Sequence, residues 1–325
     1  MKKLAILPLL FSIGLFLCLA WLWVNVQPVS SKANYVDFSV SSGSSATQIG
    51  QKLYKQGLIK NPTAFKIYVQ FSGISDSIQA GDYRLSPSLN LFQIASQLAK
   101  APLEVKVTIP EGLRREEVAA KFAKSLDQSN SFISEFIDES QGDEGYLFPD
   151  TYLVANNATP GAIIAKMKSN FDSKVSSLTP SGSNLSQSQL ITLASIIERE
   201  TKNIGDERAM VAGVLLNRLN AGMPLQIDAT VQYAVATGRC KFSILSCEWW
   251  QPLASGETSI DSPYNTYQNV GLPPGPISSP GLSAIKAAFN PMANDYWYYL
   301  HDSLGQIHFA KTLDEQNANI KKYLE

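Results

Sequence analysis

The chain has 325 residues, which allows one large domain or two modest ones, and a hydrophobic content of 45% is enough for a substantial core. The formal net charge of −1 argues against nucleic-acid binding, which usually requires a basic stripe. Only 17% of the residues are charged. Ser, Asn, Gln and Thr therefore cover much of the expected surface, which suits a neutral polar polymer as partner.

The N-terminus resembles a membrane anchor. Two lysines precede residues 4–24, which carry no charge, and about 20 apolar residues span a bilayer as a helix. Trp21 and Trp23 lie where an interfacial aromatic belt is expected. The lysines favour cytoplasmic residues 1–3, a single pass over 4–24 and an outward-facing remainder. The alternative is a cleaved signal peptide, whose apolar region would normally have only about 7–15 residues.

After a short polar linker at 25–34, a strand–glycine–helix pattern occurs twice. Apolar residues alternate over 36–40 before Gly43, and again over 105–109 before Gly112. Between the two copies we expect a helix, a short strand and a second helix, at 65–71, 79–85 and 91–98. A module of this kind, over 35–103, resembles LysM-like glycan-binding domains. A spacer that holds the following domain away from the membrane is the alternative.

The C-terminal two thirds of the chain mixes helical and extended patterns. Helices are expected at 162–171, 189–202, 207–220 and 315–324, and a hairpin is expected from 297–300 and 307–310. Residues 223–280 are rich in proline and glycine and are predicted to be mostly loop, which often builds binding sites. The expected fold class is α+β.

Two acidic residues end the apolar helix at 189–202. At 100° per residue Glu198 and Glu200 point about 200° apart, so both cannot enter one site without distortion. We prefer Glu198, because a carboxyl on an apolar helix tends to stay protonated near neutral pH, as a general acid must. Glu200 has charged neighbours that we expect to be its surface partners: Lys202, Asp206, Glu207 and Arg208. A solvated residue or a buried salt bridge is the alternative for a glutamate in this position.

Polar residues downstream are candidates for binding a sugar. Alternation predicts that Gln226, Asp228 and Thr230 share one face of an extended strand. The second group is Tyr264, Asn265, Thr266 and Tyr267. The prolines within 273–276 would add a stiff wall. Each group taken alone could simply stabilise a loop.

Several classes of site are excluded by the sequence. It has two histidines, both in the expected hairpin, and it lacks a Gly-x-Ser-x-Gly elbow, a glycine-rich phosphate loop and a histidine-rich metal pattern. We therefore expect neither a metal nor another cofactor. Cys240 and Cys247 form either a disulfide, as an exported region permits, or two free thiols.

Several segments together resemble the YceG-like family of endolytic murein transglycosylases. They are residues 145–152 (GYLFPDTY), 194–201 (ASIIERET), 217–219 (NRL), 225–231 (LQIDATV), 262–267 (SPYNTY) and 271–277 (GLPPGPI). The layout of anchor, LysM-like module and a catalytic domain at 104–325 is similar too. The resemblance implies that Glu198 is the catalytic residue. Ala229 and Gln316 depart from the family pattern, which usually has proline and histidine at these positions.

The resemblance also implies a reaction. The bond cleaved is the β-1,4 linkage between N-acetylmuramic acid and N-acetylglucosamine, and 1,6-anhydro ends are formed. The implied partners are peptidoglycan glycan strands, the cell membrane and peptidoglycan synthases. A non-catalytic glycan-binding scaffold and a hydrolytic muramidase are the alternatives.

Overall fold

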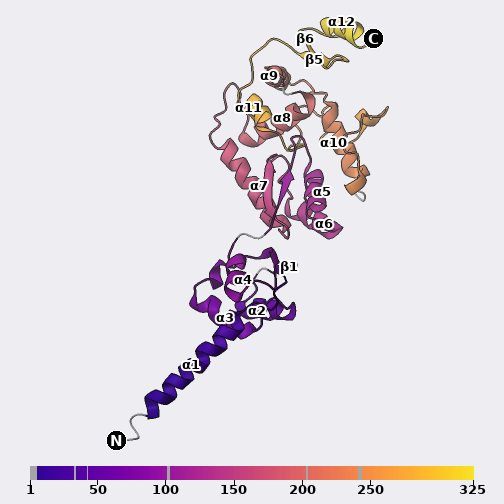
Figure 1. Ribbon diagram of the computed structural model, residues 1–325. Helices are drawn as coiled ribbons and strands as arrows, with labels where there is room; N and C mark the ends of the chain where they lie inside the picture. The colour runs from indigo at the N-terminus through magenta and orange to yellow at the C-terminus, as the bar shows by residue number, and fades with distance from the viewer. Residues whose placement is uncertain (1–5, 33, 42, 101–102, 203, 241–243) are drawn as a thin grey trace. The chain divides into compact units, whose positions relative to one another are not determined.

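The computed structural model describes residues 6–32, 34–41, 43–100, 103–202, 204–240 and 244–325 (Figure 1). The expected cytoplasmic residues 1–3 lie outside these ranges. The chain divides into two compact units, the first formed by residues 1–106 with 153–158 and the second by 107–152 with 159–325. Its helices and small two-stranded sheets make it an α+β protein, as the sequence predicts.

The first unit begins with helix α1 (Ile6–Val26), which contains most of the apolar N-terminal run. Side chains of α1 are described from residue 12 onward, and several large apolar ones are exposed, including Phe16 (70%) and Trp23 (67%). Within the described residues, no helix is both long and apolar enough to cross a membrane.

The remainder of the first unit has the order strand, two helices, strand, helix. These elements are β1 (Val36–Val40), α2 (Ala46–Lys55), α3 (Pro62–Phe71), β2 (Gly81–Leu85) and α4 (Leu91–Leu98). The strands β1 and β2 pair antiparallel, with Phe38 opposite Tyr83. Both rings are buried in a core with apolar side chains of α2, α3 and α4. The elements expected at 65–71, 79–85 and 91–98 are confirmed.

The second unit contains the larger core. Its elements are β3 (Glu104–Thr108), α5 (Arg115–Ser125), α6 (Asn130–Glu139), β4 (Thr151–Ala155), α7 (Pro160–Val175), α8 (Gln187–Glu200), α9 (Glu207–Asn220), α10 (Asp228–Arg239), α11 (Leu282–Phe289), β5 (Tyr298–His301), β6 (Ile307–Ala310) and α12 (Leu313–Tyr323). β3 pairs with β4, and β5 pairs antiparallel with β6. The boundary between the two units falls within β3 and β4.

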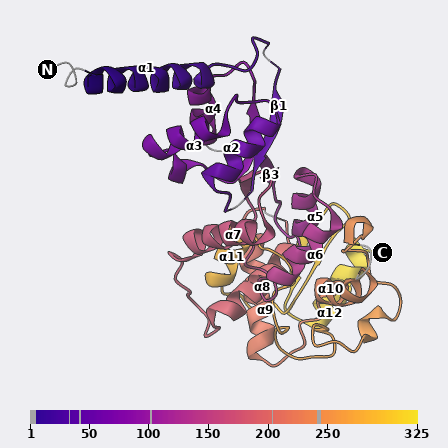
Figure 2. The ribbon, with the colours of Figure 1, turned by 90° about the horizontal axis from the view of Figure 1, so that it is seen from below.

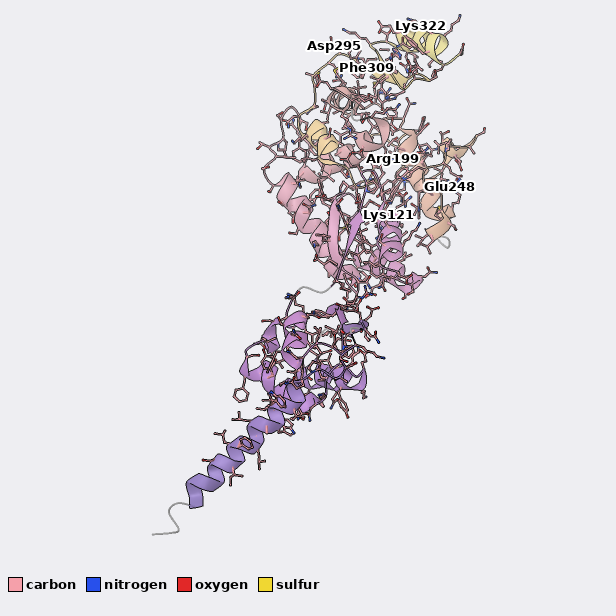
Figure 3. The ribbon with its side chains drawn as sticks, viewed as in Figure 1. Lys121, Arg199, Glu248, Asp295, Phe309 and Lys322 are labelled. Atoms are coloured by element: carbon pink, nitrogen blue, oxygen red, sulfur yellow. A yellow bond between two sulfur atoms is a disulfide. The ribbon has the colours of Figure 1, made fainter. Side chains whose placement is uncertain are left out.

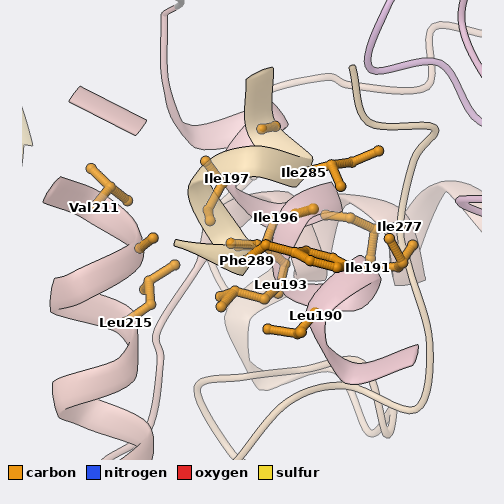
Figure 4. Close-up of a cluster of buried hydrophobic side chains, with 14 of the residues drawn as sticks. Leu190, Ile191, Leu193, Ile196, Ile197, Val211, Leu215, Ile277, Ile285 and Phe289 are labelled. Carbon is orange, nitrogen blue, oxygen red and sulfur yellow. The ribbon is translucent and has the colours of Figure 1, made fainter. Parts of the chain in front are cut away.

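Helix α8 is the centre of this core. Its residues 190–197 are all buried, and helices α9 and α11 pack against it (Figures 1 and 2). Figure 4 shows Phe289 of α11, Val211 and Leu215 of α9, and Ile277 around the α8 side chains. The helix begins at Gln187, two residues before the expected start, because Ser186 and Gln189 form a capping box that satisfies two free backbone N–H groups.

One prediction about this unit is wrong. Gln226, Asp228 and Thr230 do not share a strand face, because helix α10 begins at Asp228. Gln226 has a positive φ of 55°, which interrupts an extended chain, and the Thr230 hydroxyl donates to the Ile227 carbonyl at 2.7 Å, as in a helical turn. The stretch 223–280 is therefore less loop-rich than expected. Helices α6 and α11 are further elements that the sequence analysis did not predict.

The C-terminal hairpin has the predicted position and is attached to α9 by polar side chains. Asn217 donates to the carbonyls of Asn294 and Tyr296, both at 2.9 Å. Arg218 donates to the carbonyls of Trp297 at 2.6 Å and Leu225 at 2.7 Å. These contacts hold β5 in a position from which its Tyr299 side chain reaches Glu200 at the end of α8.

We expect Leu193→Ala to lower the free energy of unfolding by about 2–5 kcal/mol, because Leu193 is fully buried in α8 and the surrounding helices can refill the cavity only in part. Urea denaturation followed by circular dichroism measures this loss. The control Leu304→Ala removes a leucine that is 81% exposed in the hairpin turn and should change stability little. Equal effects of the two substitutions would contradict a core centred on α8.

Candidate active site

The apolar run of α8 ends at Glu198, in the last turn of the helix. Thr201 follows the helix in an extended conformation, and its N–H and hydroxyl both donate to the Ile197 carbonyl, at 3.1 and 2.6 Å. The helix thus stops just after Glu198 and Glu200, so both carboxyl groups lie at the edge of the core.

The Glu198 carboxyl lies between two hydrogen-bond donors. Its Oε1 accepts from Nη2 of Arg208 in α9 at 2.6 Å, and its Oε2 accepts from the backbone N–H of Gly281 at 3.0 Å. The side chains of Glu198 and Arg208 are each only 7% exposed. Arg208 was expected to be a surface partner of Glu200, and that prediction is wrong. Packing of α9 on α8 turns Arg208 towards Glu198 instead.

Burial is the largest influence on the Glu198 carboxyl and raises its pKa, and the nearby Glu111 raises it further. The Gly281 N–H and Arg208 act in the opposite direction, because both stabilise the ionised form. The pKa of Glu198 remains above its usual value. A carboxyl of this kind keeps its proton to higher pH than an exposed glutamate, yet has two donors ready to stabilise the anion once the proton has left.

The segment that supplies the Gly281 N–H is attached to α8 through Ser195. The Ser195 hydroxyl accepts from the Ile277 N–H at 3.0 Å, and the Ser278 hydroxyl donates to the Ser195 carbonyl at 3.2 Å. Ser195 and Ser278 are fully buried. Ser195 therefore has a structural role, because it fixes the distance between this segment and the helix that carries Glu198.

A second segment reaches Glu198 by pairing with the first. The N–H of Gly112 donates to the Ser279 carbonyl at 2.8 Å, and the N–H of Ser279 donates to the Leu113 carbonyl at 2.7 Å. Any side chain at Gly281 would overlap the carboxylate of Glu111. Glycine at this position therefore lets the two segments approach closely beside Glu198.

Arg199 points to a different side of α8 from Glu198. Its guanidinium lies 3.8 Å from the centre of the Trp250 ring and donates to the Gly112 carbonyl at 3.4 Å. The Trp250 indole in turn donates to Glu117 at 3.0 Å. Figure 3 shows Arg199 within the second unit, with side chains all around it. The arginine is thus held by an aromatic stack and does not pair with Glu198.

Glu200 belongs to a separate group of polar side chains. Its Oε2 accepts from the Tyr299 hydroxyl at 3.0 Å, and burial raises its pKa, as does the negative charge of Asp228. Asp228 itself accepts from the Tyr267 hydroxyl at 2.6 Å. The two glutamates at the end of α8 therefore have different partners, in agreement with their opposite helical directions.

The seven residues predicted to bind substrate fall into two sets. Thr230, Asn265 and Thr266 are buried and stabilise the loop: the two threonine hydroxyls are 2.9 Å apart, and the Asn265 amide donates to the carbonyls of Thr258 and Ile260. The other four retain exposed surface and remain candidates for binding: Gln226, Asp228, Tyr264 and Tyr267.

Cys240 and Cys247 form a disulfide, which decides between the two states that the sequence allows. Cys240 follows α10 directly and packs with Ala236 and Trp249 in a small apolar cluster. Trp250, which stacks on Arg199, packs against the same cluster.

A buried carboxyl with a raised pKa and two hydrogen-bond donors, next to a separate carboxylate–tyrosine group, is the arrangement expected of an enzyme that uses acid/base catalysis. The YceG-like family model matches residues 38–322. The chain belongs to the YceG-like family.

Similar proteins with known names agree with this assignment. An endolytic murein transglycosylase of Bacillus subtilis (strain 168) is 34% identical over 331 residues, covering 92% of this chain and 88% of the relative. One of Streptococcus pneumoniae (strain D39) is 30% identical over 341 residues, covering 92% of this chain. The chain spans 60% of the length of that pneumococcal relative. The crystal structure of a yceG-like protein from Listeria monocytogenes aligns with a TM-score of 0.54 at 29% identity, covering 88% of this chain and 99% of that protein.

We expect Arg208→Met to raise the pKa of Glu198 further, because the substitution removes the positive charge that favours the ionised carboxyl. A carbon-13 NMR titration of labelled glutamate carboxyls, assigned with Glu198→Gln, measures the shift. Arg239→Met is the control, since Arg239 bonds to Gln251 at 3.1 Å and has no contact with Glu198. An unchanged or lowered pKa in Arg208→Met would show that Arg208 does not stabilise the Glu198 anion.

Proposed function

We propose that this protein is an endolytic murein transglycosylase that cleaves the β-1,4 bond between N-acetylmuramic acid and N-acetylglucosamine and leaves 1,6-anhydro ends. The observation that carries the proposal is the Glu198 carboxyl, buried with a raised pKa between Arg208 and the Gly281 N–H. The names of the relatives from Bacillus subtilis and Streptococcus pneumoniae support the same activity.

The reaction needs one group that first gives a proton and then takes one back. Protonated Glu198 donates to the glycosidic oxygen, and the bond between that oxygen and the anomeric carbon breaks. The acetamido oxygen of the muramyl sugar stabilises the positive charge that develops at this carbon, as in substrate-assisted glycosidases. The C6 hydroxyl of the same sugar then attacks the anomeric carbon and returns its proton to Glu198. The ring closes without consuming water.

The environment of Glu198 fits both steps. Burial raises the pKa of the carboxyl and so favours its protonated form before the first step, while Arg208 and the Gly281 N–H stabilise the carboxylate between the steps. A hydrolytic muramidase generally uses a second carboxylate to activate water or to attack the sugar. Glu200 and Asp228 are instead engaged with Tyr299 and Tyr267. Glu111 is a further carboxylate near Glu198, 3.9 Å from Arg208 and 45% exposed, so the products distinguish a hydrolytic role for it from a nucleophile supplied by the substrate.

We expect Glu198→Gln to reduce release of glycan fragments from peptidoglycan by at least ~10²–10⁴-fold, because glutamine can neither donate nor accept the proton. The measurement is digestion of purified peptidoglycan followed by mass spectrometry. Glu200→Gln is the matched control, because Glu200 lies in the same turn of α8 but points away from Glu198. This substitution should have a mild effect on the release of fragments.

The masses of the products separate the candidate reactions. Fragments lighter than the hydrolytic products by one water molecule carry anhydro ends, as proposed. Unshifted fragments would make the protein a muramidase, and a wild-type protein that releases nothing would be a glycan-binding scaffold. A fully active Glu198→Gln protein would remove Glu198 from the catalytic role.

We further propose that the protein is a single-pass protein of the cell membrane, with both units outside the cytoplasm and close to peptidoglycan synthases. Helix α1 coincides with most of the uncharged run at 4–24, and its described apolar side chains are largely exposed. The Cys240–Cys247 disulfide fits an oxidising compartment. The β1–α2–α3–β2 order of the first unit supports a LysM-like glycan-binding module over 35–103.

We expect the protein to leave the membrane fraction when a cleavable signal peptide replaces residues 1–26, because α1 is then absent. Fractionation of cells expressing both forms and immunoblotting measure the distribution. Protease added to intact spheroplasts should digest the wild-type protein. Continued sedimentation of the shortened form with membranes, or protection of the wild type, would contradict the anchor.

A further inference from the structure

A cavity of about 430 Å³ lies in the second unit beside the first turns of α8, away from Glu198. Its size is within the usual range for ligand pockets. Ser188, Gln189 and Thr192 of α8 form one side. Residues 273–276 form a proline-rich wall, and Arg115, Gly142, Glu144 and three tyrosines complete the lining. The transfer of a proton by Glu198 makes no use of this cavity.

Glu144 is the only carboxyl group among the residues that line this cavity, and it is only 8% exposed. Its two oxygens accept long hydrogen bonds from the backbone N–H of Arg115, at 3.3 and 3.4 Å. The Tyr233 hydroxyl is 3.5 Å from Oε2, at the outer limit of a hydrogen bond. Glu144 therefore keeps most of its hydrogen-bonding capacity for whatever enters the cavity.

The charges around Glu144 favour its neutral form. Burial raises its pKa to about 8, and the negative charge of Glu116 adds to this effect, while Arg114 and Arg115 lower it. Both arginines are shared with Glu116, at 3.2 Å for Arg114 and 3.7 Å for Arg115. At neutral pH the carboxyl thus offers one O–H donor and one carbonyl acceptor side by side.

The aromatic wall of the cavity is held in place from behind. Arg114 is fully buried, with its guanidinium 4.0 Å from the centre of the Tyr233 ring and 4.4 Å from that of Trp249. The Tyr233 and Tyr264 rings lie 4.8 Å apart and tilted. Their positions are therefore set by packing before any ligand binds.

Gly145 explains how Glu144 and Tyr146 reach the cavity together. The residue has a positive φ of 84°, and a side chain there would overlap Pro276. The chain can turn against the proline wall only with glycine at this position. The polar group and the aromatic ring on either side of it are thereby directed to one place.

We propose that this cavity binds an N-acetylated sugar of the glycan strand, away from the bond that is cleaved, and that Glu144 recognises its acetamido group. The inference rests on the proposed function, because it takes the glycan strand as the ligand. A secondary amide has one N–H donor and one C=O acceptor, which match the O–H and C=O of a neutral carboxyl in a paired arrangement. The tyrosine and proline surfaces suit the apolar face of a sugar ring and the acetyl methyl group.

An acetamido group fits better than the charged groups of a stem peptide. The one cation among the described residues that line the cavity, Arg115, already donates to the Ile137 carbonyl at 2.9 Å and lies 3.7 Å from Glu116, so an ionised carboxylate would have to share it. Glu198 is six positions after Thr192 in α8, which is about 9 Å along the helix axis. A few consecutive sugars of one strand could therefore extend from Glu198 to the cavity.

The test is binding of an N-acetylglucosamine tetrasaccharide to full-length protein carrying Glu198→Gln, measured by ligand-observed NMR. In this background Glu144→Leu should weaken binding roughly tenfold, since it removes both partners of the amide. Glu144→Gln should bind normally, because a carboxamide also has a donor and an acceptor. Glu135→Leu, on the exposed face of α6, is the control. The first unit is the same in all variants, so binding there does not affect the comparison.

The pH dependence separates recognition by Glu144 from a merely structural effect. Binding by the parent protein should weaken as the pH rises through about 8, where Glu144 loses its proton. Binding by Glu144→Gln should not change over this range. Cellotetraose, which lacks acetamido groups, should bind weakly to every variant, and a stem peptide should not compete. Equal affinity of parent and Glu144→Leu, or binding by Glu144→Gln that weakens with rising pH as much as binding by the parent, would overturn the inference. Both outcomes are independent of whether Glu198 cleaves the strand.

Discussion

Complete burial of α8 is the constraint on which the rest of the second unit depends. Residues 190–197 have no exposed face, so α9, α11 and the segment around Ile277 must all pack against this one helix. The polar side chains within residues 190–197 form hydrogen bonds inside the helix or with the segment around Ile277. The Ser195 hydroxyl does both, since it donates to the Thr192 carbonyl and accepts from the Ile277 N–H. Because the helix cannot shift within such a core, the carboxyl groups at its end have fixed positions.

Three carboxyl groups of this unit illustrate how surroundings give one side chain different properties. Glu198 has two donors, Glu200 has a tyrosine hydroxyl, and Glu144 has a weakly bound backbone N–H near another carboxylate. Burial raises the pKa of all three. Of the three, Glu198 accepts hydrogen bonds both from a guanidinium, that of Arg208 at 2.6 Å, and from a backbone N–H, and both stabilise its anion once a proton is released.

Periodicity and capping signals identified much of the fold. Apolar spacing predicted the bounds of α9 and placed the start of α8 within two residues, and the strands of the hairpin lie within one residue of the expected positions. The interpretation of Gln226, Asp228 and Thr230 as a strand failed because a period of two over five residues does not exclude a helix start. Arg208 was assigned to Glu200, the nearer in sequence of the two glutamates that end α8, whereas the packing of two helices decides which carboxyl it reaches.

The sequence by itself determined the family and the α+β fold and predicted Glu198 as the site residue, because these depend on local spacing and on motifs within single segments. Only the tertiary structure decided the partners of Glu198, the Cys240–Cys247 disulfide and the cavity around Glu144. Each of these brings together groups from different segments of the chain. Their proximity depends on how the surrounding segments pack around α8, so it cannot be predicted from a pattern within one segment.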